Sequence, residues 1–386
     1  MRRAFLVILD GVGFGPAPDS SSYGDDGANT LGHVAEYAGS LHLPNLQALG
    51  LANIAPLAGL QPVNEPRAVH GLLREHSAGK DSVTGHWELC GVTNEIPFPT
   101  YPDGFPPEIV ELVREVSERE ILGNVAASGT EIMDRLGGDH VRTGALILYT
   151  SADSVLQLLA HEDIVPLDEL YRICQELRDR LQPPHRVGRV IARPFVGEEG
   201  AFERTSNRKD FAVEPTDVTV LDKLLDRGIP VYGVGKVGTL FAGRGFTSQE
   251  KTATNALGIE ATLRRMASDE SSLTFTNLLD FDTLWGHRND PAGFANGLEE
   301  FDKGLARWLD ALRPDDLLII TADHGNDPLH PGTDHSREQV PLLAMYGRGS
   351  SGTGIGVRDF SDVAATLAEF FELEWSGPGS SFLTIL

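Results

Sequence analysis

The most constraining feature of this 386-residue chain is a repeated alternation of short apolar runs with amphipathic helical patterns. Apolar runs of strand length predict buried strands, and apolar positions three and four apart predict helices that pack on them. The predicted strands cover residues 4–10, 145–149, 230–234, 273–279 and 316–321, and the predicted helices cover 216–226, 250–267, 291–312 and 361–371. We therefore predict an α/β fold with a mostly parallel central sheet and helices on both faces.

Two breaks in the pattern divide the chain. Residues 96–107 are rich in proline and indicate a crossing between domains, and Glu214-Pro215 precedes a new helix. The segment between the breaks has strand and helix signals of its own. We predict a core formed by residues 1–99 and 217–386, with a smaller α/β cap, residues 100–216, inserted into it.

Composition excludes several classes of protein. The net charge of -24, without a long basic run, opposes binding to nucleic acid. No apolar run approaches the roughly 18 residues of a membrane span, and the apolar stretch at the start ends at Asp10, which is too early for a signal peptide. Two distant cysteines suit neither a disulfide framework nor a thiolate metal site. We expect a cytoplasmic protein without a membrane or nucleic-acid partner.

One basic cluster stands out in this acidic chain. Six basic residues and three acidic ones lie between Arg186 and Lys209, which gives a local balance of +3. Such a cluster would attract an anionic substrate. A solvated loop face would have the same composition, so the pattern alone leaves both interpretations open.

Aspartates and histidines gather where predicted strands end, and these candidate metal ligands are Asp10, Asp282, His287, Asp323, His324 and His335. Singly, each could cap a turn or make a structural hydrogen bond. The carboxyl ends of parallel strands share one edge of a sheet, so we expect them to converge. Carboxylate and imidazole without thiolate suit Mn²⁺ or Zn²⁺ better than Mg²⁺. Six ligands exceed one tetrahedral site, which predicts two ions about 4 Å apart, an arrangement used in phosphoryl transfer.

A hydroxyl nucleophile is predicted in the segment Gly79–Glu88. Ser82 and Thr84 precede a predicted helix start, where backbone N–H groups would bind a phosphate. Either hydroxyl could be the nucleophile, and either could instead cap the helix. The residues themselves do not decide between them.

Longer motifs resemble one family, the phosphopentomutases of the alkaline phosphatase superfamily. The similarity runs along essentially the whole chain, and the motifs that carry it lie at residues 10–13, 24–33, 80–88, 280–287 and 323–327 and, within the cap, at 149–154 and 189–195. The resemblance implies an isomerase of nucleoside catabolism. Such an enzyme interconverts α-D-ribose 1-phosphate, or the 2-deoxy sugar phosphate, with the 5-phosphate. The route passes through a phosphothreonine and a bisphosphate, and a sugar bisphosphate primes it.

The resemblance also implies roles for individual residues. Thr84 would be the phosphorylated nucleophile and would bind one metal with Asp10, Asp323 and His324, while the second metal would be held by Asp282, His287 and His335. The ions are expected to be Mn²⁺, with Zn²⁺ or Mg²⁺ as substitutes. In the cap, Asp153 would contact a sugar hydroxyl. The anchors for the non-reacting phosphate would be Arg189, Arg204, Arg208 and, from the core, Lys236. Each of these could equally be a surface ion-pair residue, and a monomer is expected.

Three other functions compete with this one. A cofactor-independent phosphoglycerate mutase or a phosphatase of the same superfamily would have the same kind of metal-ligand cluster. Gly233–Gly238 match the glycine pattern of a dinucleotide site, but we expect no helix to open after them, so a pyrophosphate would lack its helix dipole. A non-catalytic metal-binding module is the third alternative.

Overall fold

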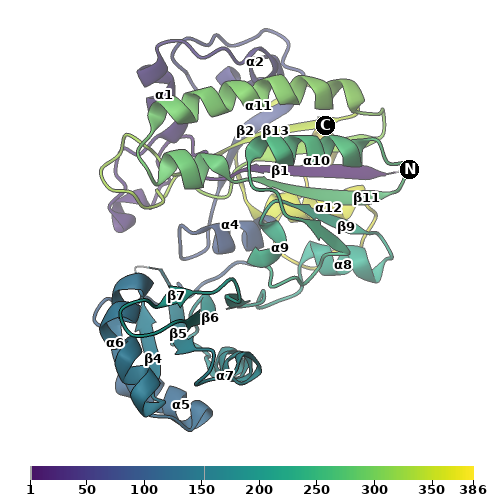
Figure 1. The fold of residues 1–386 in the computed structure, drawn as a ribbon. Coiled ribbons are helices and arrows are strands. Elements are labelled where there is room, and N and C mark those ends of the chain that lie inside the picture. The colour runs from purple at the N-terminus through teal and green to yellow at the C-terminus, as the bar shows by residue number, and fades with distance from the viewer. Residues whose placement is uncertain (1, 152) are drawn as a thin grey trace. The chain divides into compact units, whose positions relative to one another are not determined.

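The computed structural model describes residues 2–151 and 153–386, which fold into two compact units (Figure 1). Unit 1 contains the residues up to Glu95 together with Pro215–Leu386, and unit 2 contains Ile96–Glu214. The chain therefore leaves unit 1, builds unit 2 as an insertion, and returns. The proline-rich segment belongs to unit 2 and ends where helix α5 (Pro107–Ser117) begins.

Unit 1 is built on an eight-stranded sheet with the order β10-β9-β11-β1-β12-β13-β2-β14. Five of its seven neighbouring pairs are parallel, and β13 runs antiparallel to both of its neighbours. The predicted mostly parallel sheet is confirmed. The strands are β1 (Arg3–Leu9), β2 (Val69–Arg74), β9 (Val231–Val234), β10 (Ser248–Glu250), β11 (Ser272–Leu278), β12 (Asp316–Thr321), β13 (Val340–Tyr346) and β14 (Gly354–Asp359).

Strand β1 lies inside this sheet, between β11 and β12, and all seven of its residues are buried. A strand covered on both faces buries both sets of its alternating side chains, which explains the unbroken apolar run that begins at Ala4. Both neighbours are parallel to β1. The carboxyl ends of all three strands therefore meet at one edge of the sheet.

Helices cover both faces of the sheet in unit 1. Helices α1, α2, α10 and α11 pack together on one face, and α4, α8, α9 and α12 pack together on the other (Figure 1). The helical elements are η1 (Ser20–Tyr23), α1 (Thr30–Ala38), α2 (Pro44–Leu49), α3 (Leu51–Ile54), α4 (Ser82–Leu89), α8 (Val220–Asp226), α9 (Val237–Leu240), α10 (Asn255–Met266), the π-helical η2 (Phe281–Gly286), α11 (Pro291–Ala311), α12 (Ser361–Phe370) and η3 (Leu383–Ile385).

Two helices begin four to five residues later than predicted. Thr219 caps α8, because its side chain accepts a hydrogen bond from the N–H of Asp222 while the Asp222 carboxylate accepts one from the N–H of Thr219. Thr254 caps α10, and the residues before it include strand β10. The predicted starts at 216 and 250 are therefore wrong, since the capping side chains fix where helical hydrogen bonding begins.

Unit 2 has its own mixed sheet with the order β3-β4-β5-β6-β7, and β8 also pairs with β6. Helices α5 and α7 share one hydrophobic core with Leu146 and Leu148 of β4. Ile147 and Tyr149 of the same strand enter a second core with α6, as the alternation of a pleated strand requires. The elements are β3 (Ile121–Ala126), α6 (Gly129–Thr143), β4 (Leu146–Thr150), β5 (Val155–His161), α7 (Leu167–Arg180), β6 (Arg189–Val196), β7 (Glu203–Arg204) and β8 (Lys209–Ala212).

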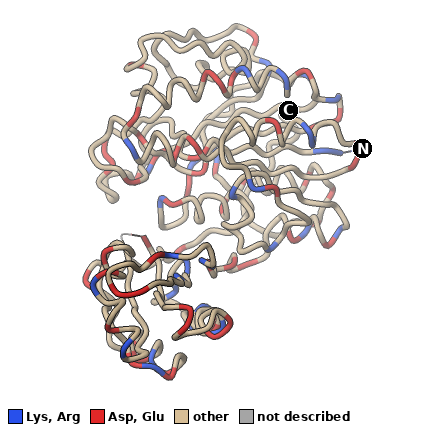
Figure 2. Tube along the Cα trace, viewed as in Figure 1, with Lys and Arg blue, Asp and Glu red and all other residues tan. Residues whose placement is uncertain are grey.

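Charged residues of both signs are distributed along both units (Figure 2). Acidic residues nevertheless exceed basic ones by 24. Within the described residues, none of the helices has the length and apolar character that a membrane span requires.

Candidate metal centre and arginine-lined pocket

The candidate metal ligands follow the carboxyl ends of three adjacent parallel strands in unit 1. Asp10 follows β1, Asp282 lies in η2 just after β11, and Asp323 follows β12. All three carboxylates are buried. The parallel register therefore accounts for their convergence, although Asp10 is separated from the other two by more than 250 residues in sequence.

Two groups of three side chains present ligand atoms close enough to share a cation. One group is Asp10, Asp323 and His324, and the other is Asp282, His324 and His335. Within each group the ligand atoms lie within 4.8 Å of one another. Because His324 belongs to both, the groups form one continuous cluster, which contains five of the seven predicted ligands.

The imidazoles point into this cluster. His324 Nε2 lies 3.4 Å from Asp10 Oδ1 and 3.3 Å from Asp323 Oδ2. His335 Nε2 lies 3.1 Å from Asp282 Oδ1, and the rings of His324 and His335 stack with centroids 3.9 Å apart. The ring nitrogens that would face a metal therefore lie against carboxylate oxygens.

His287 lies at the edge of the cluster. Its Nδ1 donates to the carbonyl oxygen of Thr333 at 2.7 Å, which leaves Nε2 facing Asp282 Oδ1 at 3.4 Å. A backbone acceptor on Nδ1 fixes the tautomer whose Nε2 lone pair can bind a metal. His287 lies outside the two compact groups but presents a nitrogen to one of their members.

The two candidate hydroxyls lie at the start of α4 and have different partners. Ser82 Oγ lies 3.1 Å from His324 Nε2. Thr84 Oγ1 lies 3.1 Å from both the carbonyl oxygen and Oδ2 of Asp81, the residue that caps the helix. The contacts in this structure therefore bring Ser82, and not the Thr84 hydroxyl, against a candidate ligand.

Gly85 allows α4 to approach the metal cluster closely. A Cβ atom at this position would lie 2.1 Å from the carbonyl oxygen of Asp323. The backbone of α4 thus contacts the backbone just after β12, where the candidate ligands Asp323 and His324 lie. The neighbouring Thr84 is buried at this contact.

The cluster balances its negative charge internally. Burial raises the pKa of Asp10, but Lys236 and His324 together lower it by more than burial raises it. The pKa of Asp10 therefore lies well below its ordinary value. Burial and the charge of Asp10 raise the pKa of Asp282, while His335 and His324 lower it to about 2. Burial lowers the pKa of His324, and the surrounding carboxylates raise it to about 10. Without a metal, protons and an ammonium group supply the positive charge.

Three polar residues complete the cluster, of which only Lys236 was assigned a role from the sequence. Lys236 Nζ lies 2.9 Å from Asp10 Oδ2, and Asn277 donates to the same oxygen at 3.0 Å. Asn326 donates to Asp282 Oδ1 at 2.7 Å. Asn277 could have been found from the sequence, because it is an amide within the predicted buried strand 273–279. A buried amide requires a hydrogen-bond partner. Lys236, predicted as a phosphate anchor, is engaged here with a candidate metal ligand.

The donor set fits divalent cations. Asp10 Oδ1, Asp323 Oδ2 and His335 Nε2 are buried and, in residues 2–151 and 153–386, make the ion-pair contacts given above but no hydrogen bond. Buried polar atoms without partners are uncommon and call for a ligand or an ion. Oxygen and nitrogen donors without thiolate suit the transition metals predicted above.

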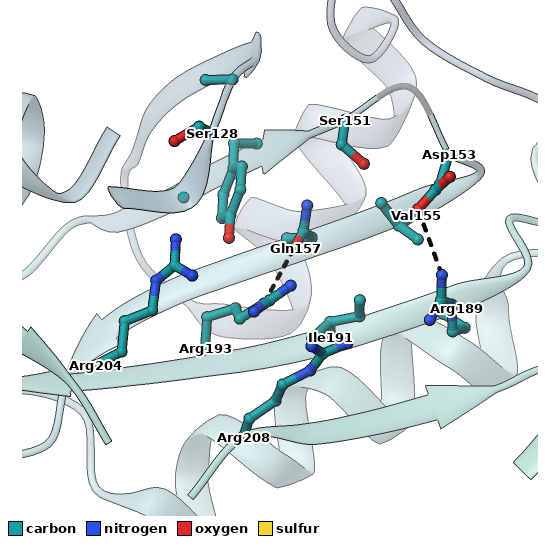
Figure 3. A pocket seen from close by; sticks show the side chains of 13 residues that line it. Ser128, Ser151, Asp153, Val155, Gln157, Arg189, Ile191, Arg193, Arg204 and Arg208 are labelled. Carbon is teal, nitrogen blue, oxygen red and sulfur yellow. Dashed lines mark hydrogen bonds and ion pairs between the residues drawn. The ribbon is translucent and has the colours of Figure 1, made fainter. Parts of the chain in front are cut away.

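Unit 2 contains a cavity of about 360 Å³ lined by basic residues (Figure 3). Asp153, Arg189, Arg204 and Arg208, four of the five predicted substrate-binding residues, lie in its wall. Lys236 is the exception, because it belongs to unit 1. Arg193 also lines the cavity and was counted in the basic cluster without being assigned a role.

The arginines of the cavity differ in how far they are already paired. Arg208 donates from Nε and Nη2 to the two carboxylate oxygens of Asp210, each at 2.6 Å. Arg189 lies 3.5 Å from Asp153 and 3.6 Å from Asp210. Arg204 makes no such ion pair among the described residues. Of these three predicted anchors, Arg204 therefore has the guanidinium most available to a ligand.

Known proteins are similar to this chain over nearly its whole length. A phosphopentomutase of Carboxydothermus hydrogenoformans is 51% identical over 384 residues, covering 99% of this chain and 98% of that protein. A phosphopentomutase of Clostridium novyi is 49% identical over 385 residues with the same coverage. The chain belongs to the phosphopentomutase family. It is thus an intramolecular phosphotransferase of the isomerase class.

The wider family and the fold agree with this membership. Residues 2–375 match the model of the metalloenzyme superfamily, so metal dependence is a family property of this phosphopentomutase homologue. The PH0037 protein from Pyrococcus horikoshii has a solved structure with a TM-score of 0.50 and 18% identity, covering 98% of this chain and 99% of that one. That similarity supports the shared alkaline phosphatase-like fold and nothing more specific.

Membership of the phosphopentomutase family also settles the competing interpretations. The two relatives above are named phosphopentomutase, not phosphoglycerate mutase or phosphatase, and each is about 50% identical over nearly the whole of both chains. The dinucleotide pattern has another explanation. Gly238 makes room for Gln249, whose Cδ would lie 1.8 Å from a Cβ at that position. No helix begins in residues 239–247 after the pattern, as expected, and α9, which begins within the pattern at Val237, has only four residues.

Proposed function

We propose that the chain interconverts α-D-ribose 1-phosphate, or 2-deoxyribose 1-phosphate, with the 5-phosphate, through a phosphothreonine at Thr84 and a sugar bisphosphate. The observation that carries this proposal is the joint cluster of carboxylates and imidazoles at the ends of β1, β11 and β12, with the start of α4 packed against it. The relatives named phosphopentomutase support the substrate class.

The metal ligands in this proposal are Asp10, Asp323 and His324 for one ion and Asp282, His287 and His335 for the other, with Thr84 joining the first set. Bound divalent cations, which we propose to be Mn²⁺, would neutralise charge on the transferring phosphoryl group and lower the pKa of the attacking hydroxyl. His287 supports this division through its Nε2, which faces Asp282.

The transfer itself needs two exchanges that balance. In the first, the bond between phosphorus and Thr84 Oγ1 breaks as the free hydroxyl of a sugar phosphate bonds to phosphorus, and the hydroxyl proton ends on Thr84. In the second, Thr84 takes the other phosphoryl group of the bisphosphate and returns the proton to the sugar. The backbone N–H groups at the start of α4 favour the negative charge on the phosphorylated threonine.

Unit 2 supplies the groups that hold the part of the substrate that does not react. Asp153 is proposed to contact a sugar hydroxyl, and Arg189, Arg204 and Arg208 to provide the positive field for the second phosphate. Lys236 is proposed to contribute to phosphate binding once cations replace it as the partner of Asp10. A sugar bisphosphate would prime the threonine, because the unphosphorylated chain has no phosphoryl group to donate.

The test compares two hydroxyl deletions in metal-loaded protein. Thr84→Ala is expected to abolish both labelling by a radioactive sugar bisphosphate and conversion of ribose 1-phosphate, while Ser82→Ala keeps measurable labelling. Circular dichroism spectra of both variants control for folding. Labelling that survives in Thr84→Ala and disappears in Ser82→Ala would move the nucleophile to the hydroxyl that lies near His324. Parallel assays with 3-phosphoglycerate and for release of free phosphate check the reaction class.

A further inference from the structure

The side chain of Asp81 holds the hydroxyl of Thr84 at the start of helix α4. Thr84 Oγ1 donates to Asp81 Oδ2 at 3.1 Å and lies at the same distance from the Asp81 carbonyl oxygen. Thr84 is fully buried, and Asp81 is partly buried beside it. The carboxylate therefore contacts the oxygen that, in the proposed function, carries the phosphoryl group.

The other oxygen of this carboxylate caps the helix. Asp81 Oδ1 accepts hydrogen bonds from the N–H groups of Val83 at 2.9 Å and of Thr84 at 3.1 Å. A cap needs a side-chain oxygen but no charge, since Ser and Asn cap helices about as well as Asp. Capping therefore accounts for Oδ1 and leaves the contact between Oδ2 and the Thr84 hydroxyl without a structural explanation.

The basic side chains that contact the segment before α4 are paired with other carboxylates. Lys80 Nζ lies 3.0 Å from Asp25 Oδ2, and Arg337 Nη1 donates to Glu75 Oε2 at 2.6 Å. In the part of the chain that the structure describes, none of the Lys, Arg and His side chains forms an ion pair with Asp81. No basic side chain therefore offsets the negative charge that Asp81 presents to Thr84.

The carboxylate is also held in place. A Cβ atom at Gly79 would lie 3.0 Å from both Asp81 Oδ2 and Thr84 Oγ1, so the backbone passes directly beside their contact. The carbonyl oxygen of Gly79 accepts a hydrogen bond from Arg337 Nη1 at 2.5 Å, which fixes this stretch of backbone. Asp81 could turn away from Thr84 only by giving up the capping bonds of Oδ1.

Phosphorylation of Thr84 removes the hydrogen on which this contact depends. The bond from phosphorus to Oγ1 replaces the O–H bond, the bond from phosphorus to a sugar oxygen of the bisphosphate breaks, and the proton passes to that sugar oxygen. Oγ1 then has nothing to donate, and the Asp81 carboxylate faces phosphoryl oxygens of its own charge. Such repulsion is stronger in a buried site than in water.

We propose that Asp81 is a positioning residue that stabilises the free hydroxyl of Thr84 and destabilises the phosphothreonine, so that the phosphoryl group passes on to a sugar phosphate instead of staying on the protein. The inference rests on the proposed function and adds to it the residue that sets the lifetime of the phosphothreonine. It also gives a physical reason for priming, because the unphosphorylated chain is then the more stable form.

Two variants of full-length, metal-loaded protein test this role. Asp81→Asn and Asp81→Ser both keep an oxygen that can cap α4, and both remove the charge. Each protein is labelled with radioactive ribose 1,5-bisphosphate, separated from the excess and mixed with ribose 5-phosphate. We expect the label on Thr84 to last about tenfold longer in both variants, and half-maximal labelling to need about tenfold less bisphosphate.

The control is Asp290→Asn, because the carboxylate of Asp290 also caps a helix, α11, by accepting from the N–H of Gly293 at 2.9 Å. This variant should leave the lifetime of the label and the bisphosphate requirement within about twofold. The direction of the change separates the proposed role from a structural one, since a distorted helix start would lower labelling and would not prolong it.

The outcomes also separate this inference from the proposed function. If the unaltered protein is labelled on Thr84 but the label lasts no longer in the Asp81 variants, or labelling of both variants falls, Asp81 is only a cap and the proposed function stands. If the unaltered protein carries no label on Thr84, the phosphothreonine route and the role of Asp81 both fail.

Discussion

Replacing Gly85 with alanine should separate helix α4 from the metal cluster without unfolding the protein. The added Cβ would lie 2.1 Å from the carbonyl oxygen of Asp323 and 2.9 Å from its carbonyl carbon, where ordinary contact begins near 3.4 Å. Both obstructing atoms are backbone, so no side chain can rotate out of the way. The helix must therefore move by about 1 Å or more, and Thr84 moves with it.

The size of the effect follows from this displacement. A misplacement of about 1 Å costs about 10²-fold in rate, which corresponds to about 2.7 kcal/mol in transition-state stabilisation. Overpacking costs about 1–3 kcal/mol of stability, and the better helix propensity of alanine offsets up to about 1 kcal/mol. Against a typical total of about 5–15 kcal/mol the variant stays folded. We expect a loss of about 10²-fold in kcat and in the rate of phosphoenzyme formation.

The assay is a single-turnover measurement of labelled phosphoenzyme beside steady-state kcat and thermal unfolding. Gly349→Ala is the control, because this glycine lies outside the helices and a Cβ there meets no atom within 4 Å. Unaltered phosphoenzyme formation in Gly85→Ala, with a normal unfolding temperature, would refute the idea that contact between α4 and Asp323 positions the nucleophile.

Three further predictions concern other parts of the chain. Arg3→Met should destabilise the protein by about 3–5 kcal/mol in denaturant unfolding, because it leaves Asp316 buried without its bidentate partner. Cys90 and Cys174 are free and buried, and burial raises the pKa of both thiols, so native protein should not react with Ellman's reagent. Binding of Mn²⁺ at pH 8 should release about one proton from His324, whose pKa in the metal-free chain is about 10.

Each of these predictions has its own control. Arg307→Met breaks an exposed pair with Glu260 and should cost less than about 1 kcal/mol, so an equal loss in both arginine variants would remove the argument from burial. Both thiols should react once guanidinium unfolds the chain, and rapid labelling of folded protein would contradict their burial. For the metal, the bound imidazole is neutral and a proton competes below the pKa, so affinity should rise about tenfold per pH unit between about pH 7 and 9. A flat profile would show that no proton leaves His324.

The sequence predicted that the carboxylates of the metal cluster converge, because their convergence depends on where the strands end. Once residues 4–10, 273–279 and 316–321 are taken as parallel strands, the polar residues that follow them must share an edge. The strand limits needed only to be right within about two residues, since Asp10, Asp282 and Asp323 all lie just beyond them. Apolar runs of this length carry that information directly.

Other features depend on contacts that a linear pattern does not contain. The antiparallel course of β13 is fixed by its pairing with β12 and β2, not by its own composition. The position of Lys236 beside Asp10 arises from the turn after β9, where a glycine pattern suggested a different function. Tyr149 appeared as an apolar strand residue, because only the packing of α6 on β4 shows that its hydroxyl lacks a partner.

The electrostatics of the two units suggest how an acidic chain can handle a doubly anionic substrate. In unit 1 the carboxylates need cations before any phosphate can approach, so catalytic power there depends on metal loading. In unit 2 the positive charge belongs to guanidinium groups, which under the proposed function would hold a phosphate without activating it. A mutase requires this asymmetry, because only one of two chemically similar phosphoryl groups should react at a time. It also requires that the holding site release its phosphate when the bisphosphate reverses, so contacts there must be few and indifferent to the sugar carbon.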